Sequence, residues 1–215
     1  MNPTIQAKLD KFFSQYRLIK YKKNEIIYRP GDIPDHVAYI KSGYVRLYII
    51  SEKGEELTIF LLKPFFYFTL NFALTDSENK YFFETISPVE LWRAPKEDTL
   101  KFIKSDPEMM LEIIRNVLDG MNDLLVNIEY IITGNAKVKV AAMLYLFATR
   151  FGKKDGDHII IEVTPTHYDI GGLLGMTRET VSKQMRELKK MQIVTKNGKH
   201  TVILDMEKLQ EMLSI

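Results

Sequence analysis

The sequence predicts an α+β fold that consists of an N-terminal antiparallel β jelly-roll barrel, a long helix and a C-terminal winged helix-turn-helix. Three observations predict it. Short apolar runs separated by glycine turns fill residues 18–95, an apolar heptad repeat runs through residues 110–131, and two short helical patterns joined by a glycine occupy residues 166–188. We expect three parts, at residues 1–106, 107–133 and 134–215.

The composition is that of an ordinary globular chain. Its 215 residues are 46% hydrophobic and 27% charged, so a sizeable core is possible. Because cysteine is absent, disulfides, thiolate zinc sites and an iron–sulfur cluster held by cysteines are excluded. Residues 1–132 hold 17 Lys+Arg against 19 Asp+Glu, whereas residues 133–215 hold 13 against 9. The C-terminal part is therefore the better partner for an anion.

No segment resembles a targeting or membrane-spanning element. The first eight residues lack the apolar core of a signal peptide. The nearest approach to a membrane span, residues 57–74, is interrupted by Lys63, Pro64 and Asn71, which favours buried strands and turns. We expect a cytoplasmic protein that does not contact a membrane.

The first part begins with a helical pattern and continues as strands. Residues 1–16 place Ile5, Leu9, Phe12 and Phe13 on one side of a helix. Strand-like runs follow at residues 25–28, 37–40, 44–50, 57–62 and 89–92, separated by turns at residues 30–32, 42–43 and 53–55. Short strands at about ten-residue spacing are typical of an antiparallel barrel or jelly roll.

A heptad seam predicts a dimerisation helix over residues 107–133. The seam alternates steps of three and four residues and comprises Met110, Ile114, Val117, Met121, Leu124, Ile128 and Ile131. A neighbouring stripe has a spacing of seven and comprises Leu111, Leu118, Leu125 and Ile132. We expect the seam to pair with a second copy of the chain and the stripe to cover the barrel. Thr133-Gly134-Asn135 ends this helix, and another helix is expected from Lys137 to about Phe151.

Residues 166–188 read as a helix-turn-helix. Thr166 and Asp169 form a capping-box-like start, Ile170, Leu173 and Leu174 are expected to be buried, and Gly175 ends the first helix. Thr177 caps a second helix whose inward face is Val181, Met185 and Leu188. Its outward residues are Arg178, Glu179, Ser182, Lys183 and Arg186. Arginine can donate two hydrogen bonds to guanine, and glutamate can accept one from cytosine, so double-stranded DNA is the expected partner.

A hairpin follows the helix-turn-helix. Two β-prone runs flank Asn197-Gly198, a strong turn signal, within residues 193–204. Lys196, Lys199 and His200 lie near the tip and can contact phosphates, although a solvated turn without a role in DNA binding is the alternative.

Other classes of protein fit the sequence less well. An enzyme is not expected, because the barrel part contains one histidine, His36, and no nucleophile or phosphate-loop motif is present. The same histidine is a poor haem ligand, since it lies in a predicted turn, and no metal site is expected. A dimeric interaction module that has lost DNA binding stays open as an alternative, although it would have little reason to keep Arg178, Glu179 and Lys183.

The order of barrel, long helix and winged helix-turn-helix, with Thr177-Arg-Glu-Thr-Val-Ser-Lys183, resembles the CRP/FNR family of bacterial transcription regulators over nearly the whole chain. The resemblance implies a cyclic nucleotide-binding-like domain and a homodimer that binds a palindromic operator. It also implies contact with RNA polymerase, as an activator makes, although the sign of regulation stays open. Arg178, Glu179 and Lys183 match base-reading positions, and Ser182 fits the branch with Glu-x-x-Ser-Arg. The whole predicted DNA-binding set is Thr166, Thr177, Arg178, Glu179, Ser182, Lys183, Arg186 and Lys199.

The effector site departs from the family pattern. Cyclic-nucleotide-binding members carry Gly-Glu and then Arg-Ser or Arg-Thr, whereas the corresponding positions here hold Phe68-Thr69 and Asn79-Lys80. Leu124 and Leu125 stand where readers of cyclic AMP place hydroxyl residues. The resemblance therefore implies an effector other than a cyclic nucleotide, with cyclic-nucleotide response and effector independence as the alternatives.

An aromatic cluster replaces the phosphate cassette, and it comprises Phe60, Phe65, Phe66, Tyr67, Phe68, Phe72, Tyr81, Phe82 and Phe83. It suits a small apolar or aromatic effector, but these rings could equally fill the barrel core. The predicted effector-binding set is Tyr67, Phe68, Thr69, Asn71, Lys80, Phe82, Leu124 and Leu125.

Overall fold

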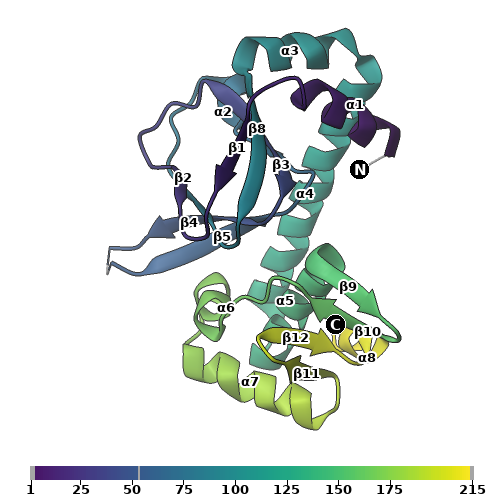
Figure 1. Ribbon diagram of the computed structural model, residues 1–215. Coiled ribbons are helices and arrows are strands. Elements are labelled where there is room, and N and C mark those ends of the chain that lie inside the picture. The colour runs from purple at the N-terminus through teal and green to yellow at the C-terminus, as the bar shows by residue number, and fades with distance from the viewer. Residues whose placement is uncertain (1–2, 53, 214–215) are drawn as a thin grey trace. The chain divides into compact units, whose positions relative to one another are not determined.

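The computed structural model describes residues 3–52 and 54–213, except the side chains of residues 123 and 127 (Figure 1). The chain divides into two compact units, Met1–Gly120 and Met121–Ile215, and the division falls inside one long helix. The two units are called the barrel unit and the winged-helix unit below. The expected three-part boundaries stay a prediction.

The barrel unit contains two four-stranded antiparallel sheets, which confirms the predicted fold class. One sheet has the order β1-β8-β3-β6 and the other β2-β7-β4-β5. The bounds are β1 Leu18–Tyr21, β2 Ile26–Tyr28, β3 His36–Ser42, β4 Val45–Ile50, β5 Glu56–Leu62, β6 Tyr67–Phe68, β7 Phe82–Thr85 and β8 Val89–Pro95. β1, β6 and β7 had not been predicted. The turn at residues 53–55 is only partly visible, because residue 53 lies outside the described residues.

The core of the barrel unit has two layers, because successive residues of a strand point to opposite faces of its sheet. On β3, Ala38 and Ile40 join Val45, Leu62 and Phe83 of the second sheet in a cluster between the sheets. Val37 and Tyr39 point the other way and pack against helices. Strand β3 is thus buried on both faces, which explains its continuous apolar sequence.

Helices pack against the outer face of the first sheet. They are α1 Pro3–Phe13, the short helix α2 Leu70–Thr75, α3 Lys96–Ser105 and the start of α4 Pro107–Thr133. The predicted N-terminal helix is confirmed over residues 3–13, and residues 1–2 lie outside the described residues. Phe12 of α1 stacks on Phe102 of α3 with ring centroids 4.2 Å apart.

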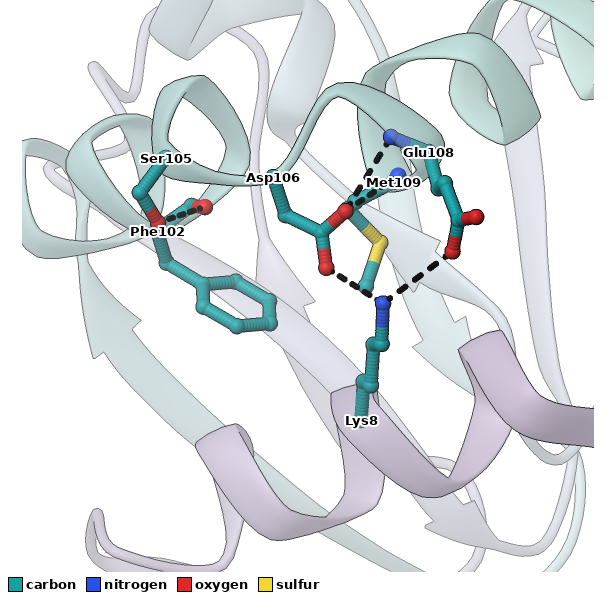
Figure 2. Close-up of polar contacts among 6 residues, drawn as sticks. All are labelled: Lys8, Phe102, Ser105, Asp106, Glu108 and Met109. Carbon is teal, nitrogen blue, oxygen red and sulfur yellow. Dashed lines mark hydrogen bonds and ion pairs between the residues drawn. The ribbon is translucent and has the colours of Figure 1, made fainter.

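Asp106 fixes the corner between α3 and α4 (Figure 2). Its Oδ1 accepts hydrogen bonds from the backbone N–H groups of Glu108 and Met109, at 3.1 and 3.2 Å, and so caps α4. Its Oδ2 accepts from Lys8 Nζ of α1 at 2.6 Å, and this bond lowers the pKa of the Asp106 carboxyl. One carboxylate therefore joins α1 to the first turn of the long helix.

The long helix α4 is confirmed, but the predicted role of its flanking stripe is wrong. The face that meets the barrel core carries Met109 and Ile113, which are buried. Leu111 lies about 200° around the helix from Met109, and Leu111, Leu118, Leu125 and Ile132 are all at least half exposed. Six seam residues are also exposed, from Met110 at 39% to Val117 at 57%, and Ile131 is half-buried. Seam and stripe form one exposed apolar face.

The winged-helix unit packs three helices and a short terminal one on a four-stranded sheet of order β11-β12-β10-β9. The bounds are α5 Ala136–Phe151, β9 Gly152–Asp155, β10 His158–Ile161, α6 His167–Leu174, α7 Arg178–Lys190, β11 Val194–Asn197, β12 His200–Ile203 and α8 Met206–Glu211. Helix α5 and the final hairpin are confirmed, whereas the sequence did not predict β9, β10 and α8. Leu144, Ile170 and Leu188 are among its fully buried side chains.

Two kinds of feature are absent from the described residues. No helix in this part of the chain is both long and apolar enough to cross a membrane. Likewise, no three His, Asp or Glu side chains among those described are grouped so that they could hold a metal ion.

Candidate DNA-binding site

The first helix of the motif, α6, is built as the local sequence predicts. Thr166 Oγ1 accepts from the Asp169 backbone N–H at 3.1 Å, and Asp169 Oδ2 accepts from the Thr166 backbone N–H at 2.9 Å, so the capping box is confirmed. Gly175 ends the helix in the left-handed conformation with φ of 62°. Ile170 and Leu174 are buried as expected, but Leu173 is only half-buried because it lies at the edge of the buried stripe.

The turn between the helices requires a glycine that had not been singled out. A Cβ on Gly171 would lie 2.5 Å from the Met176 carbonyl oxygen, closer than real Cβ contacts allow. Met176 also donates a hydrogen bond from its backbone N–H to the Gly171 carbonyl oxygen at 2.8 Å. Gly171 thus lets α7 begin close against α6.

The second helix, α7, has the predicted inward face. Thr177 Oγ1 caps it by accepting from the Thr180 N–H at 3.2 Å. Val181, Met185 and Leu188 are buried. This anchoring fixes which residues of α7 face away from the unit.

The outward face of α7 carries charges without partners inside the molecule. Arg178, Glu179, Lys183 and Arg186 are exposed. Within the residues that the structure describes, none of the four makes an ion pair or a hydrogen bond with another side chain. Nearby Lys137 and Glu187, in contrast, pair with each other at 3.2 Å. These four residues are therefore available to an external partner.

Ser182 differs from the fully outward position that the sequence predicts. It is half-buried on the flank of α7 that faces α6, and its Oγ lies 2.8 Å from His167 Nδ1. Sequence reasoning missed His167, although its place directly after the N-cap Thr166 puts it in the first turn of α6. The two helices of the motif are joined at this point by a polar contact.

The wing is the predicted hairpin. Asn197 pairs with His200 across the turn, and Gly198 adopts φ of 58°. Lys196 and Lys199 are exposed at its tip. His200 is half-buried with Nδ1 3.2 Å from the Ile161 carbonyl oxygen, and its contact with a phosphate stays a prediction.

A hollow of about 560 Å³ joins α6, the start of α7 and the wing. Its polar lining includes Thr166, His167, Arg178, Lys196, Lys199 and Thr201. Burial lowers the pKa of His167, and the charges of Lys196 and Arg178 lower it further. Three cations at one hollow, with the N-terminus of α6 beside them, suit an anion such as a phosphate of a nucleic-acid backbone.

The predicted effector residues in the barrel belong to different layers of the unit. Phe68 is buried in the layer between the sheets and stacks on Phe83, with ring centroids 5.2 Å apart. Tyr67 points to the opposite layer, and burial raises the pKa of its hydroxyl. Thr69 is buried, and its hydroxyl donates to the His36 carbonyl at 2.8 Å.

The other predicted effector residues are exposed or half-buried. Asn71 and Lys80 are exposed, and Phe82 is half-buried and stacks on Tyr48 at 4.9 Å. Leu124 and Leu125 are exposed on α4 and belong to the winged-helix unit. The structure thus does not gather the predicted set within either unit.

Asn79 occupies a position of the missing phosphate cassette and serves a structural purpose. It is fully buried, and its Nδ2 donates to the carbonyls of Arg29 and Tyr81 at 2.8 and 2.7 Å. Of the aromatic cluster, Phe68, Phe72 and Phe83 are buried, whereas Phe65 and Phe66 are exposed. These side chains supply core packing and backbone support, and none of them supplies a charge for a phosphate.

Two family models match the chain. The Crp-like helix-turn-helix domain matches residues 138–212, and the Cyclic nucleotide-binding domain matches residues 18–106. Between them they span most of the chain, in the order in which the two compact units occur.

Similar proteins match the chain over most of its length. The chain is 26% identical over 185 residues to the Global nitrogen regulator of a Nostoc species, with 85% of this chain and 83% of that protein covered. It is 26% identical over 220 residues to the Fumarate and nitrate reduction regulatory protein of Vibrio cholerae, with 100% and 85% covered. Among solved structures, FixK2 from Bradyrhizobium japonicum shares the fold, with a TM-score of 0.76 at 19% identity over 93% of this chain and 98% of that one. Both relatives are regulatory proteins by name, in line with the expected non-enzymatic class.

Proposed function

Because the chain belongs to the CRP/FNR family of transcription regulators, we propose that it acts as a homodimer that binds a palindromic operator through residues 178–190. The observation that carries the proposal is the outward face of α7, where Arg178, Glu179 and Lys183 have no partner among the described residues. Exposed cations and a carboxylate on one helix suit the base edges and phosphates of the major groove.

The exposed apolar face of α4 supports a dimer. Val117, Leu118, Met121, Leu124 and Leu125 are each more than half exposed, and contiguous apolar surface of this kind marks an interaction site. The seam keeps the heptad spacing of a coiled coil, so a second copy of the same helix is its natural partner. Two copies related by a two-fold axis would present two α7 helices, which is why we propose a palindromic target.

Charge at the proposed interface also favours DNA. Lys196 and Lys199 line one hollow, where a backbone phosphate can be held beside the N-terminus of α6. The proposed contacts divide accordingly: Arg178, Glu179 and Lys183 read bases, whereas Arg186, Lys199, Thr166 and Thr177 hold the backbone. In activation, the bound dimer would meet RNA polymerase.

For regulation we propose a small effector other than a cyclic nucleotide. Phe68, Thr69, Asn79 and Lys80 replace the phosphate cassette, and the Thr69 hydroxyl and the Asn79 amide are already engaged by the backbone. The buried rings of Phe68, Phe72 and Phe83 favour a second candidate, a regulator without an effector in the barrel. Thermal-shift screening against cyclic nucleotides, aromatic acids, phenols and fatty acids distinguishes them, since a ligand at 100 times its Kd stabilises by about 2.7 kcal/mol.

A binding-site selection on the purified protein, with and without cell extract, tests the DNA proposal. We expect a two-fold palindrome with a G·C pair under Arg178 in each half. Enrichment of no palindrome under either condition would favour the interaction module instead.

Charged substitutions on the seam test the dimer. The double change Val117→Glu and Leu124→Glu should convert the dimer to monomer in sedimentation and weaken binding to the full palindrome by at least about tenfold. Ile33→Glu is the matched control, because Ile33 is a highly exposed apolar residue of the barrel unit. A double variant that remained dimeric would refute the assignment of the seam.

A further inference from the structure

The contact between His167 and Ser182 lies inside the proposed DNA-binding face but is explained neither by capping nor by core packing. The two residues are 15 positions apart, and Ser182 Oγ lies 2.8 Å from His167 Nδ1. Ser182 also follows Arg178 by four residues, so both lie on the same flank of α7. His167 of α6 thus contacts Ser182, which lies on the same side of α7 as Arg178.

The other ring nitrogen of His167 is isolated. His167 Nε2 is buried and has no hydrogen-bond partner among the described residues. Burial, with Lys196 of β11 and Arg178 of α7 nearby, lowers the pKa of the imidazole, so the neutral ring is the form present at neutral pH. A neutral imidazole has one N–H and one bare nitrogen.

The isolated Nε2 decides between the two neutral tautomers. With the proton on Nε2, a buried N–H would have no acceptor, and the Ser182 hydroxyl would have to donate to Nδ1. With the proton on Nδ1, that N–H donates to Ser182 Oγ, and only an acceptor lone pair is left unsatisfied at Nε2. Orphaned N–H groups are the rarer defect in proteins, which favours the proton on Nδ1.

We propose that His167 is a positioning residue, which donates from Nδ1 to Ser182 Oγ and thereby leaves the Ser182 hydroxyl proton free to donate to a base edge. This inference rests on the proposed function, in which α7 reads DNA. In the major groove the donor suits guanine, the N7 of adenine or the O4 of thymine, whereas cytosine presents a donor. Because His167 occupies one of the two acceptor lone pairs of Oγ and leaves the proton available, Ser182 favours an acceptor over cytosine at one position in each half-site, and His167 is required for that preference.

Four proteins test the proposal by titration against the selected operator and its variants with cytosine at each position. Ser182→Ala should lose about threefold to tenfold of discrimination against cytosine at one position, as expected for one hydrogen bond. His167→Phe should lose the same amount although Ser182 is still present. His167→Asn should retain it, because the asparagine amide nitrogen can take the place of Nδ1. The double variant His167→Phe with Ser182→Ala should lose no more than either single change.

The controls separate positioning from a structural effect. His158→Phe makes the same change at an exposed histidine of the β9–β10 hairpin and should leave the preference unaltered. If His167→Phe proves unstable in thermal unfolding, His167→Gln replaces it, since the longer glutamine amide reaches toward Nε2 and not Nδ1. Nitrogen NMR of the ring in the whole protein should place the proton on Nδ1 at neutral pH.

The outcomes distinguish this inference from the proposed function. A wild-type protein that selects a palindrome, while His167→Phe keeps its preference against cytosine, would overturn the inference alone. Equal weakening on every sequence would also overturn the inference, because it would indicate a phosphate contact. A proton found on Nε2 would overturn it as well. Failure of the wild type to select any site would overturn both.

Discussion

Arg46 in the barrel unit and Arg178 in the winged-helix unit have opposite surroundings. Arg46 donates to Glu84 and Glu56 and lies 4.2 Å from the Tyr48 ring centroid, so strands β4, β5 and β7 hold it on three sides. Arg178 is exposed and has no side-chain partner in the part of the chain that the structure describes. The first guanidinium stabilises the fold, whereas the second is available for binding. An arginine paired within its own unit therefore indicates a structural role, whereas an exposed arginine without a side-chain partner indicates a surface for binding.

Removal of Arg46 should have the largest effect, and it should fall on stability. Arg46→Ala leaves Glu84, whose side chain is only 12% exposed, without its cation. We expect a loss of about 1.5–3 kcal/mol in the free energy of unfolding, the range for a hydrogen bond to a charged group. Chemical denaturation measures it. Arg17→Ala, at an exposed arginine of the same unit, is the control and should change little. Similar losses in both variants would break the comparison.

Removal of Arg178 should reverse the pattern. Arg178→Ala should weaken specific DNA binding by about 1–3 kcal/mol and relax the preference at one G·C pair, because two hydrogen bonds to guanine are lost. Its melting temperature should match that of the wild type. Gel-shift titrations with the selected operator and a G·C-substituted operator measure the change. Specificity left intact would contradict the assignment of Arg178.

Arg186 should give a smaller and less selective effect. It lies two turns beyond Arg178 on α7 and is exposed. Arg186→Ala should weaken all sequences alike and reduce the slope of log affinity against log salt by about 0.9, as expected for one phosphate contact. Titrations at several salt concentrations test it. A loss confined to one base position would assign Arg186 to base reading instead.

The smallest effect is expected at Lys8, which pairs with Asp106 at the surface of the barrel unit (Figure 2). This pairing lowers the pKa of Asp106 and raises that of Lys8. The pair therefore stabilises the fold above the usual carboxyl pKa of 3.8 and below the usual lysine pKa of 10.5, and loses its effect as the pH falls through the folded-state pKa of Asp106. Lys8→Met should lower the melting temperature slightly at neutral pH, with a difference that disappears in strong acid. A difference that persisted there would point to packing.

The winged-helix unit was easier to predict than the barrel unit because its signals are local. The cap at Thr166, the stop at Gly175 and the inward residues Val181 and Leu188 each depend on neighbours within four positions. The contact of His167 with Ser182 joins two helices, so no spacing rule could reveal it.

The barrel depends on pairing between distant strands. β7 joins β2 and β4 although its sequence, Phe-Phe-Glu-Thr, lacks clear alternation. The stripe at Leu111 and Leu118 was misassigned because periodicity identifies an apolar face but not its partner. For the same reason the aromatic cluster could not be divided in advance into the buried Phe68 and the exposed Phe65.

The number of residues in α4 sets the angular position, about the helix axis, of the residues that follow it. This helix runs without a break from Pro107 to Thr133 and passes from one compact unit into the next. Since an α-helix turns by about 100° per residue, one inserted or deleted codon near its middle would rotate everything that follows by that angle. Seven codons would restore the phase to within about 20°. Seven codons would also keep the heptad spacing of the exposed apolar face of α4, whereas one codon would break it.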